Sequence, residues 1–68
     1  NMEIDDLRSL VEEDLEEELS NCMSELMNLR FRASTMQLTN VREIGNVRRR
    51  IARIKTIVKE RELAEALR

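Results

Sequence analysis

The sequence contains no proline, histidine, tryptophan or tyrosine, and it has one glycine, one cysteine and one phenylalanine among its 68 residues. A β-sandwich or barrel needs turn residues and strands with alternating β-branched side chains, which this composition does not supply. The abundant leucine, methionine, glutamate and arginine instead favour long helices. We therefore predict an all-α fold.

The missing residue types also exclude most catalytic and metal sites. Without histidine the chain lacks the commonest general base and metal ligand. Cys22 is its single cysteine, so neither an internal disulfide nor a zinc cluster is expected, and we interpret Cys22 as a small buried hydrophobe. Glu16, Glu17 and Glu18 point in different directions on a helix and cannot converge on one cation. We predict no enzymatic activity, no cofactor, no metal and no small-molecule substrate.

No stretch of the chain approaches the roughly 20 apolar residues that cross a bilayer. The acidic first turns also lack a signal-peptide pattern, and we expect no membrane partner. Residues 1–68 are expected to form a single domain. A domain of this size is marginally stable alone, so a partner surface should help to stabilise it.

Three helices are predicted from the spacing of the apolar residues, at about residues 2–8, 10–36 and 40–65. The two long helices each carry an apolar series with steps of three and four. The series are Val11, Leu15, Leu19, Cys22, Leu26, Leu29, Ala33 and Met36, then Val41, Ile44, Val47, Ile51, Ile54 and Val58. Two capping boxes are expected to start these helices: Ser9 with Glu12, and Asn40 with Glu43.

The short connection between the long helices makes them antiparallel neighbours, which gives a two-helix hairpin with a short N-terminal helix. Matching the two series predicts six pairs: Met36 with Val41, Ala33 with Ile44, Leu29 with Val47, Leu26 with Ile51, Cys22 with Ile54, and Leu19 with Val58. Beyond them Leu15 would face Glu62, so the match ends there. We expect Ile4 and Leu7 of the short helix to pack into this open end.

Charge is distributed unevenly although the formal net charge is only −2. Residues 1–34 hold ten acidic and three basic residues, whereas residues 35–68 hold nine basic and four acidic residues. Because salt screens interactions beyond about 8 Å, a partner responds to local charge. The hairpin is therefore predicted to be basic at its turn and acidic at its open end, where residues 12–18 are expected to pair with Lys59 and Arg61.

The basic turn end is predicted to enter RNA, because guanidinium groups can bind phosphates through two hydrogen bonds. The alternative interpretation is a solvated helix face. Gly45 costs about 1 kcal/mol inside a helix, and either close approach of RNA or simple tolerance would explain it. Asn28, Gln37, Asn40 and Asn46 are candidate polar contacts. The arginines of this end are Arg30, Arg32, Arg42, Arg48, Arg49, Arg50 and Arg53.

The segments Asn28-Leu29-Arg30-Phe31, Gln37-Leu38 and Val47-Arg48-Arg49-Arg50-Ile51-Ala52-Arg53-Ile54-Lys55-Thr56 resemble bacterial large-subunit ribosomal protein twenty-nine. The resemblance covers about residues 2–62. It implies a helical hairpin that is a structural constituent of the large ribosomal subunit and binds ribosomal RNA near the nascent-chain exit tunnel. It also implies ribosomal protein twenty-three as a neighbour, and chaperones or targeting factors as visitors. The implied RNA contacts are Arg30, Gln37, Arg48, Arg49, Arg53, Lys55 and Thr56.

The chain departs from that family at three points. The family usually has glycine in place of Met36 and a basic residue in place of Gly45, and it is usually basic overall. Met36 predicts a different end of the first long helix, and Gly45 predicts the loss of one phosphate contact. The acidic N-terminal half argues against RNA contact by residues 1–20 but not against contact by the second long helix. A different hypothesis is a helical-hairpin oligomerisation or protein-interaction module without RNA binding, whose apolar series self-associate into a four-helix bundle. A ribosomal member would act in the cytoplasm, with an organellar ribosome as the alternative.

Overall fold

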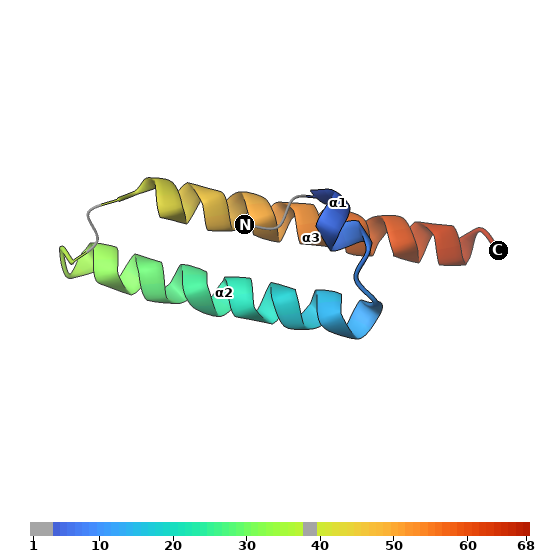
Figure 1. The fold of residues 1–68 in the computed structure, drawn as a ribbon, viewed down its shortest axis with the longest axis horizontal. Coiled ribbons are helices and arrows are strands. Elements are labelled where there is room, and N and C mark those ends of the chain that lie inside the picture. The colour runs from blue at the N-terminus through green and yellow to red at the C-terminus, as the bar shows by residue number, and fades with distance from the viewer. Residues whose placement is uncertain (1–3, 38–39) are drawn as a thin grey trace.

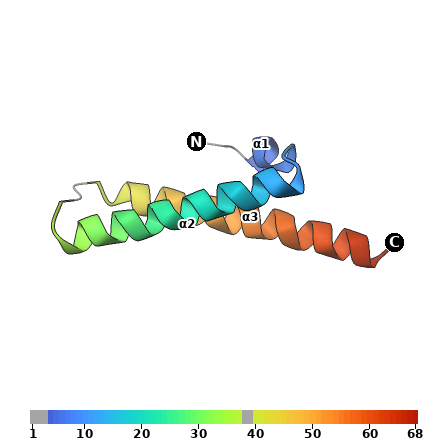
Figure 2. The same cartoon turned by 90° about the horizontal axis from the view of Figure 1, so that it is seen from below.

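The computed structural model describes residues 4–37 and 40–68. It contains three helices, α1 (Ile4–Arg8), α2 (Glu12–Ser34) and α3 (Arg42–Ala66). The long helices α2 and α3 lie side by side and run in opposite directions, and α1 packs against α3 near the end where α2 begins (Figures 1 and 2). Among the described residues there is no strand, and no helix is both long and apolar enough to cross a membrane. The predicted all-α hairpin is confirmed.

The start of α2 differs from the prediction, because Ser9 does not form the expected capping box. Its hydroxyl donates to the carbonyl of Asp6 at 2.6 Å and so completes α1 instead. Val11 occupies the N-cap position of α2 and provides no side-chain hydrogen bond. The helix N-terminus is instead favoured by carboxylates of the first turn, Glu12, Glu13 and Asp14.

The end of α2 is set by a turn at Met36, so the helix stops at Ser34 rather than continuing to residue 36. Met36 has φ 61°, the left-handed region that glycine adopts most readily. The N–H of Met36 donates to the carbonyl of Ala33 at 3.1 Å, and the N–H of Gln37 donates to that of Arg32 at 2.8 Å. This is the Schellman arrangement. A side chain in this conformation costs about 1–2 kcal/mol, so the turn is strained.

Asn40 contributes to the start of α3, although it does not occupy the N-cap position. Its Oδ1 accepts a hydrogen bond of 3.0 Å from the N–H of Arg42, and its carbonyl accepts one of 3.3 Å from the N–H of Glu43. Val41 is the N-cap residue and provides no side-chain hydrogen bond. The predicted role of Asn40 is therefore confirmed in part.

The hydrophobic core follows the contact between α2 and α3, as the apolar series predict. Its buried members on these helices are Leu15, Cys22, Leu29, Val47, Ile51, Ile54 and Ile57. Four further series members are partly buried against them: Leu19, Leu26, Ile44 and Val58. The middle of the predicted register, from Leu29 with Val47 to Cys22 with Ile54, is consistent with this continuous core.

Both ends of the predicted register need correction. At the turn, Met36 and Val41 are 91% and 72% exposed, so this pair does not join the core. At the open end the buried core continues beyond the six predicted pairs, because Leu15 is buried, and Ile57, which the apolar series omitted, is buried as well. The cause is α1, because it packs on α3 with Leu7 fully buried and extends the covered face of α3.

Two arginines hold α1 against α3. The guanidinium of Arg8 lies 2.6 Å from the carboxylate of Glu60. Nη2 of Arg61 donates to the carbonyls of Arg8 and Leu10 at 3.2 and 2.6 Å, which satisfies acceptors left open at the end of α1. The predicted packing of Leu7 is confirmed, whereas the side chain of Ile4 and residues 1–3 lie outside the described part of the chain.

The expected ion pairs between residues 12–18 and the end of α3 are wrong. Arg61 binds the backbone carbonyls instead, and Lys59 lies 4.0 Å from Glu62 of its own helix. Arg61 and Lys59 therefore bind α1, the segment after it and α3 rather than the acidic first turns of α2.

Candidate nucleic-acid interface

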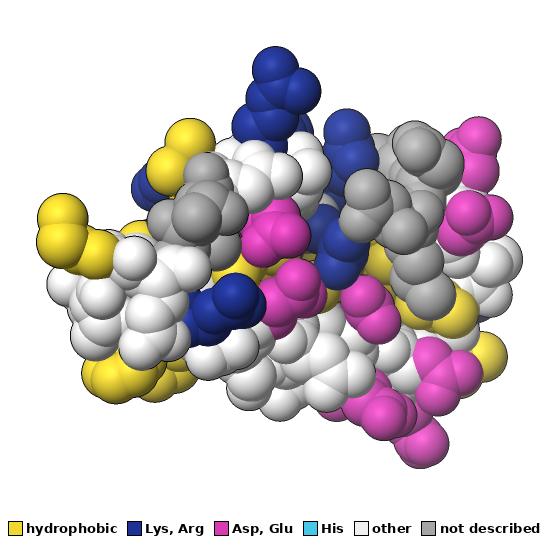
Figure 3. Space-filling model, turned by 60° about the vertical axis from the view of Figure 1, so that its left-hand side comes forward, with side chains coloured by type: hydrophobic (Ala, Val, Ile, Leu, Met, Phe, Trp, Pro, Cys, Tyr) yellow, Lys and Arg dark blue, Asp and Glu magenta, His cyan; other side chains and the backbone are white. Residues whose placement is uncertain are grey.

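Exposed basic side chains gather on the turn-proximal half of the hairpin. Val47, Ile51 and Ile54 hold one side of α3 against α2, so the remaining sides of α3 face solvent. Figure 3 shows Lys and Arg side chains projecting from the upper edge of the molecule, further Lys and Arg beside Asp and Glu in the middle of this face, and other Asp and Glu side chains toward the right-hand end. The exposed members of the predicted contact set on the helices are Arg30, Arg42, Arg48, Arg49, Arg53, Lys55 and Thr56.

Most of these basic groups have no intramolecular ion pair. Within the part of the chain that the structure describes, the side chains without a salt bridge are Arg30, Arg42, Arg48, Arg49, Arg53 and Lys55. Arg49 makes one polar contact, in which its Nη2 donates to Oδ1 of Asn46. Unpaired cations on a rigid helix can bind phosphates without first breaking a contact of their own.

Arg50 differs from its neighbours because it is engaged within the hairpin. Its side chain is only 15% exposed, and its Nη1 lies 3.7 Å from Oε2 of Glu25 and 3.8 Å from Sγ of Cys22. Burial raises the pKa of the Cys22 thiol, and the hydrogen bond from Arg50 opposes this shift only in part. Cys22 therefore stays a neutral, buried thiol, as its interpretation as a small hydrophobe requires.

The other predicted contacts take different positions. Arg32 is half-buried on α2, and Gln37 is exposed in the turn. The hydroxyl of Thr56 donates to the carbonyl of Ala52 at 2.9 Å, which leaves its oxygen as an acceptor only. Of the three, Gln37 and Arg32 therefore retain donors for a ligand.

Gly45 is not required by the protein's own packing. A Cβ atom added there would lie 3.4 Å from Nη1 of Arg49, which is the movable end of a long side chain. Apart from its chain neighbours and the local helix backbone, the three nearest atoms all belong to the side chain of Arg49. The hairpin therefore tolerates Gly45 without needing it.

A polar groove lies between α2 and α3 close to the turn. It encloses about 570 Å³, which falls within the range of roughly 300–1,000 Å³ for small-ligand sites. The two helices contribute Glu25, Asn28, Arg32, Glu43, Asn46 and Arg50. The sequence indicated Asn28, Asn40 and Asn46 as polar contacts but did not show that they line one groove. The predicted pairing of Leu29 with Val47 was the available signal, because these residues directly follow Asn28 and Asn46 in the chain.

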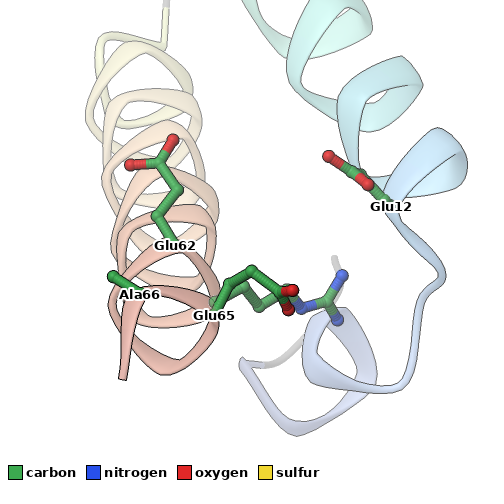
Figure 4. A pocket seen from close by; sticks show the side chains of 5 residues that line it. Glu12, Glu62, Glu65 and Ala66 are labelled. Carbon is green, nitrogen blue, oxygen red and sulfur yellow. The ribbon is translucent and has the colours of Figure 1, made fainter. Parts of the chain in front are cut away.

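The open end carries a concavity with an excess of acidic side chains. It is lined by Glu12 at the start of α2 and by Arg61, Glu62, Glu65 and Ala66 of α3. Figure 4 shows Glu12 and Glu62 on opposite sides of the gap between the two helices. No group of carboxylates, cysteine or histidine in the described residues is arranged to hold a metal ion. Three carboxylates at this end repel a polyanion, so the hairpin is polarised along its length.

A family model described as "Ribosomal L29 protein" matches residues 5–61. The chain belongs to this family. It is 50% identical over 62 residues to the large ribosomal subunit protein uL29 of Finegoldia magna, which covers 91% of each chain. The uL29 of Caldanaerobacter subterraneus subsp. tengcongensis is also 50% identical over 62 residues, covering 91% of this chain and 94% of that protein. The uL29 of Corynebacterium kroppenstedtii is 52% identical over 58 residues, covering 85% and 76% respectively.

Membership in the ribosomal L29 family confirms the resemblance found in the sequence. The family consists of structural ribosomal proteins rather than enzymes. Its bacterial members indicate a ribosomal, cytoplasmic location. The unpaired basic side chains of the turn-proximal half are therefore the candidate surface for contacts within the ribosome.

Proposed function

We propose that this chain is a structural component of the large ribosomal subunit that binds ribosomal RNA with the turn-proximal half of its hairpin. The observation that carries the proposal is the gathering of exposed, unpaired basic side chains at one end of a preformed helix pair. Phosphates are neutralised by Arg30, Arg42, Arg48, Arg49, Arg53 and Lys55. Further polar contacts are made by Arg32, Gln37, Arg50 and Thr56. Contacts of this kind position RNA without reading much sequence.

The proposal places the chain near the exit of the nascent-chain tunnel, beside ribosomal protein twenty-three. Family membership supports this placement, because the resemblance in residues 47–56 implies it. The acidic open end, with Glu12, Glu62 and Glu65, then faces away from RNA toward solvent or protein. Chaperones and targeting factors that dock near the tunnel exit are proposed as further partners.

A self-associating module is less well supported, because the apolar residues it would use are already covered. Leu29, Val47 and Ile54 are at most 3% exposed within a single chain. A four-helix bundle built on the same residues would therefore have to open the hairpin. Sedimentation of the free chain tests this directly, since a bundle loses its assembly when Leu26 and Ile51 become polar.

The proposed function is tested by measuring co-sedimentation of the full chain with purified large subunits over a series of salt concentrations. A surface that neutralises about six phosphates gives a log–log slope of about −4 to −5. The Arg49→Glu/Arg53→Glu variant removes two contacts, so its slope should be shallower by about 1.4–1.8 and its affinity lower, with unchanged helicity.

The matched control is Lys59→Glu/Arg68→Glu, which makes the same change of net charge at the open end. This variant should co-sediment like the unmodified chain. Association that is insensitive to salt, or an equal loss in both variants, would contradict the proposed interface.

A further inference from the structure

The polar groove between α2 and α3 has a different chemistry from the basic outer faces of α3. Two guanidiniums, Arg32 and Arg50, are balanced there by two carboxylates, Glu25 and Glu43. A groove with no net charge gains little from binding phosphates. It does, however, offer hydrogen-bond donors and acceptors side by side, which is what the edge of a nucleobase requires.

Three side-chain amides add to this set: Asn28 of α2, Asn46 of α3, and Asn40 just before α3. Asn46 accepts a hydrogen bond from Nη2 of Arg49, which fixes its oxygen and leaves its NH₂ group to donate. Asn28 is exposed and makes no side-chain hydrogen bond with any residue that the structure describes. Its amide therefore has both a donor and an acceptor available for a ligand.

Arg50 gives the groove a fixed wall. Its guanidinium is anchored by Glu25 at 3.7 Å and by Cys22 at 3.8 Å, and its side chain is largely buried. A planar guanidinium can stack on a base. Because Arg50 is already ordered in the free chain, binding a base against it costs little side-chain entropy.

We propose that this groove binds a single unpaired nucleobase of RNA, extruded from a helix whose phosphates lie on the basic faces of α3. The inference rests on the proposed RNA-binding function and adds base readout to it. The volume of about 570 Å³ suits one nucleotide and not an RNA helix. Adenine, cytosine and guanine carry exocyclic amino groups that Glu25, Glu43 and the Asn28 oxygen can accept from, whereas uracil carries none.

The test uses the full chain and a short RNA duplex, either fully paired or carrying one bulged nucleotide, with adenosine, cytidine, guanosine and uridine bulges compared. Fluorescence anisotropy at low salt gives each affinity. Bulges with an amino group should bind about 2- to 10-fold more tightly than the uridine bulge, which corresponds to one net hydrogen bond.

Asn28→Leu removes one of the three acceptors of the groove, so it should reduce this dependence on the base while leaving the affinity for the fully paired duplex unchanged. The matched control is Asn21→Leu, an exposed asparagine of α2 outside the groove, which should keep the base dependence. Arg49→Glu/Arg53→Glu should weaken binding of every duplex by one common factor.

The results separate the two claims. Equal affinity for all four bulges, or a base dependence as large in Asn28→Leu as in the unmodified chain, overturns the groove proposal. If the paired duplex still binds and the arginine variant still weakens it, the proposed RNA-binding function stands without the groove. Absence of binding to every duplex would overturn both.

Discussion

The two ends of the hairpin use their charged side chains differently. At the open end, Arg8 pairs with Glu60 and Arg61 binds two backbone carbonyls, so these cations hold helices together. At the turn end, Arg48 and Arg53 have no ion-pair partner among the described residues. A high density of arginine therefore does not by itself identify an interface. A guanidinium that already binds within the protein stabilises the fold, whereas one without such a partner is available to a ligand.

The burial of apolar side chains also differs between the two ends, and it is greater at the open end. Leu7 of α1, Leu15 of α2 and Ile57 of α3 are at most 2% exposed at the open end, and each contributes about 1.5–3 kcal/mol, whereas Met36 and Val41 at the turn are 91% and 72% exposed. Closer to the turn, α1 is absent and the core narrows to α2 and α3. Local stability should therefore decrease toward the turn, which leaves that end able to adjust to a partner.

The largest expected effect comes from breaking the core of the open end. Ile57→Ala should lower the free energy of unfolding by about 2–5 kcal/mol. That is a large share of the roughly 3–10 kcal/mol expected for 68 residues. Val41→Ala at the exposed turn should change it by less than about 0.5 kcal/mol. Urea unfolding followed by circular dichroism measures both, and equal losses would show that the two ends are equally important to the fold.

Releasing α1 from α3 should have the next largest effect. Arg61→Met keeps the aliphatic stem but loses both hydrogen bonds to the carbonyls of Arg8 and Leu10, which should cost about 1–2 kcal/mol. Amide hydrogen exchange in α1 should accelerate. Arg68→Met is the control, since it removes an exposed cation that does not contact α1, and exchange as fast as in Arg61→Met would refute the role of Arg61.

A third change sharpens the comparison at the turn by relieving its strain. Met36→Gly should raise the free energy of unfolding by about 1 kcal/mol, because glycine adopts the left-handed conformation without a steric cost. The same substitution at Met27, an exposed position inside α2, should lower it by a similar amount. Thermal unfolding of both variants measures the difference, and effects of the same sign would argue against a strained turn.

The smallest expected effect concerns the pH dependence of the open end. The hydrogen bond from Arg8 lowers the pKa of Glu60, so this carboxylate stabilises the fold above its unfolded pKa. The stabilisation is lost as the pH falls through the lower folded pKa. Glu60→Gln should therefore flatten the decrease of stability on the acid side. In an Arg8→Met background the same substitution should have no such effect, and a persisting effect would assign it to another partner.

The sequence was sufficient for the helices and for the middle of the hairpin because apolar periodicity and a short connection determine both. It failed at Ser9, whose hydroxyl could cap α2 or complete α1, and only the packed fold decides between them. It also failed at Ile57, because the apolar series did not include the contribution of α1 to the covered face of α3. Both errors arise where a third element enters a two-helix prediction.

The candidate site was predictable to the extent that helical periodicity separates exposed from buried side chains. Arg48, Arg49 and Arg53 lie on sides of α3 away from the apolar face, and they are exposed as expected. Arg50 lies at the border of that face, where its engagement with Glu25 and Cys22 follows only from the three-dimensional packing. The polar groove could not be predicted either, because it forms only when residues of α2 and α3 are brought together by the packing.

The division between a binding end and a folding end is tested most directly by arginine modification. The full chain, free and assembled into large subunits, would be treated with a dicarbonyl reagent, and the reactivity of each arginine read by mass spectrometry. Arg48, Arg49 and Arg53 should react readily in the free chain and become protected on assembly, while Arg68 stays equally reactive in both. Protection of Arg68 with continued reactivity of Arg49 and Arg53 would contradict the account.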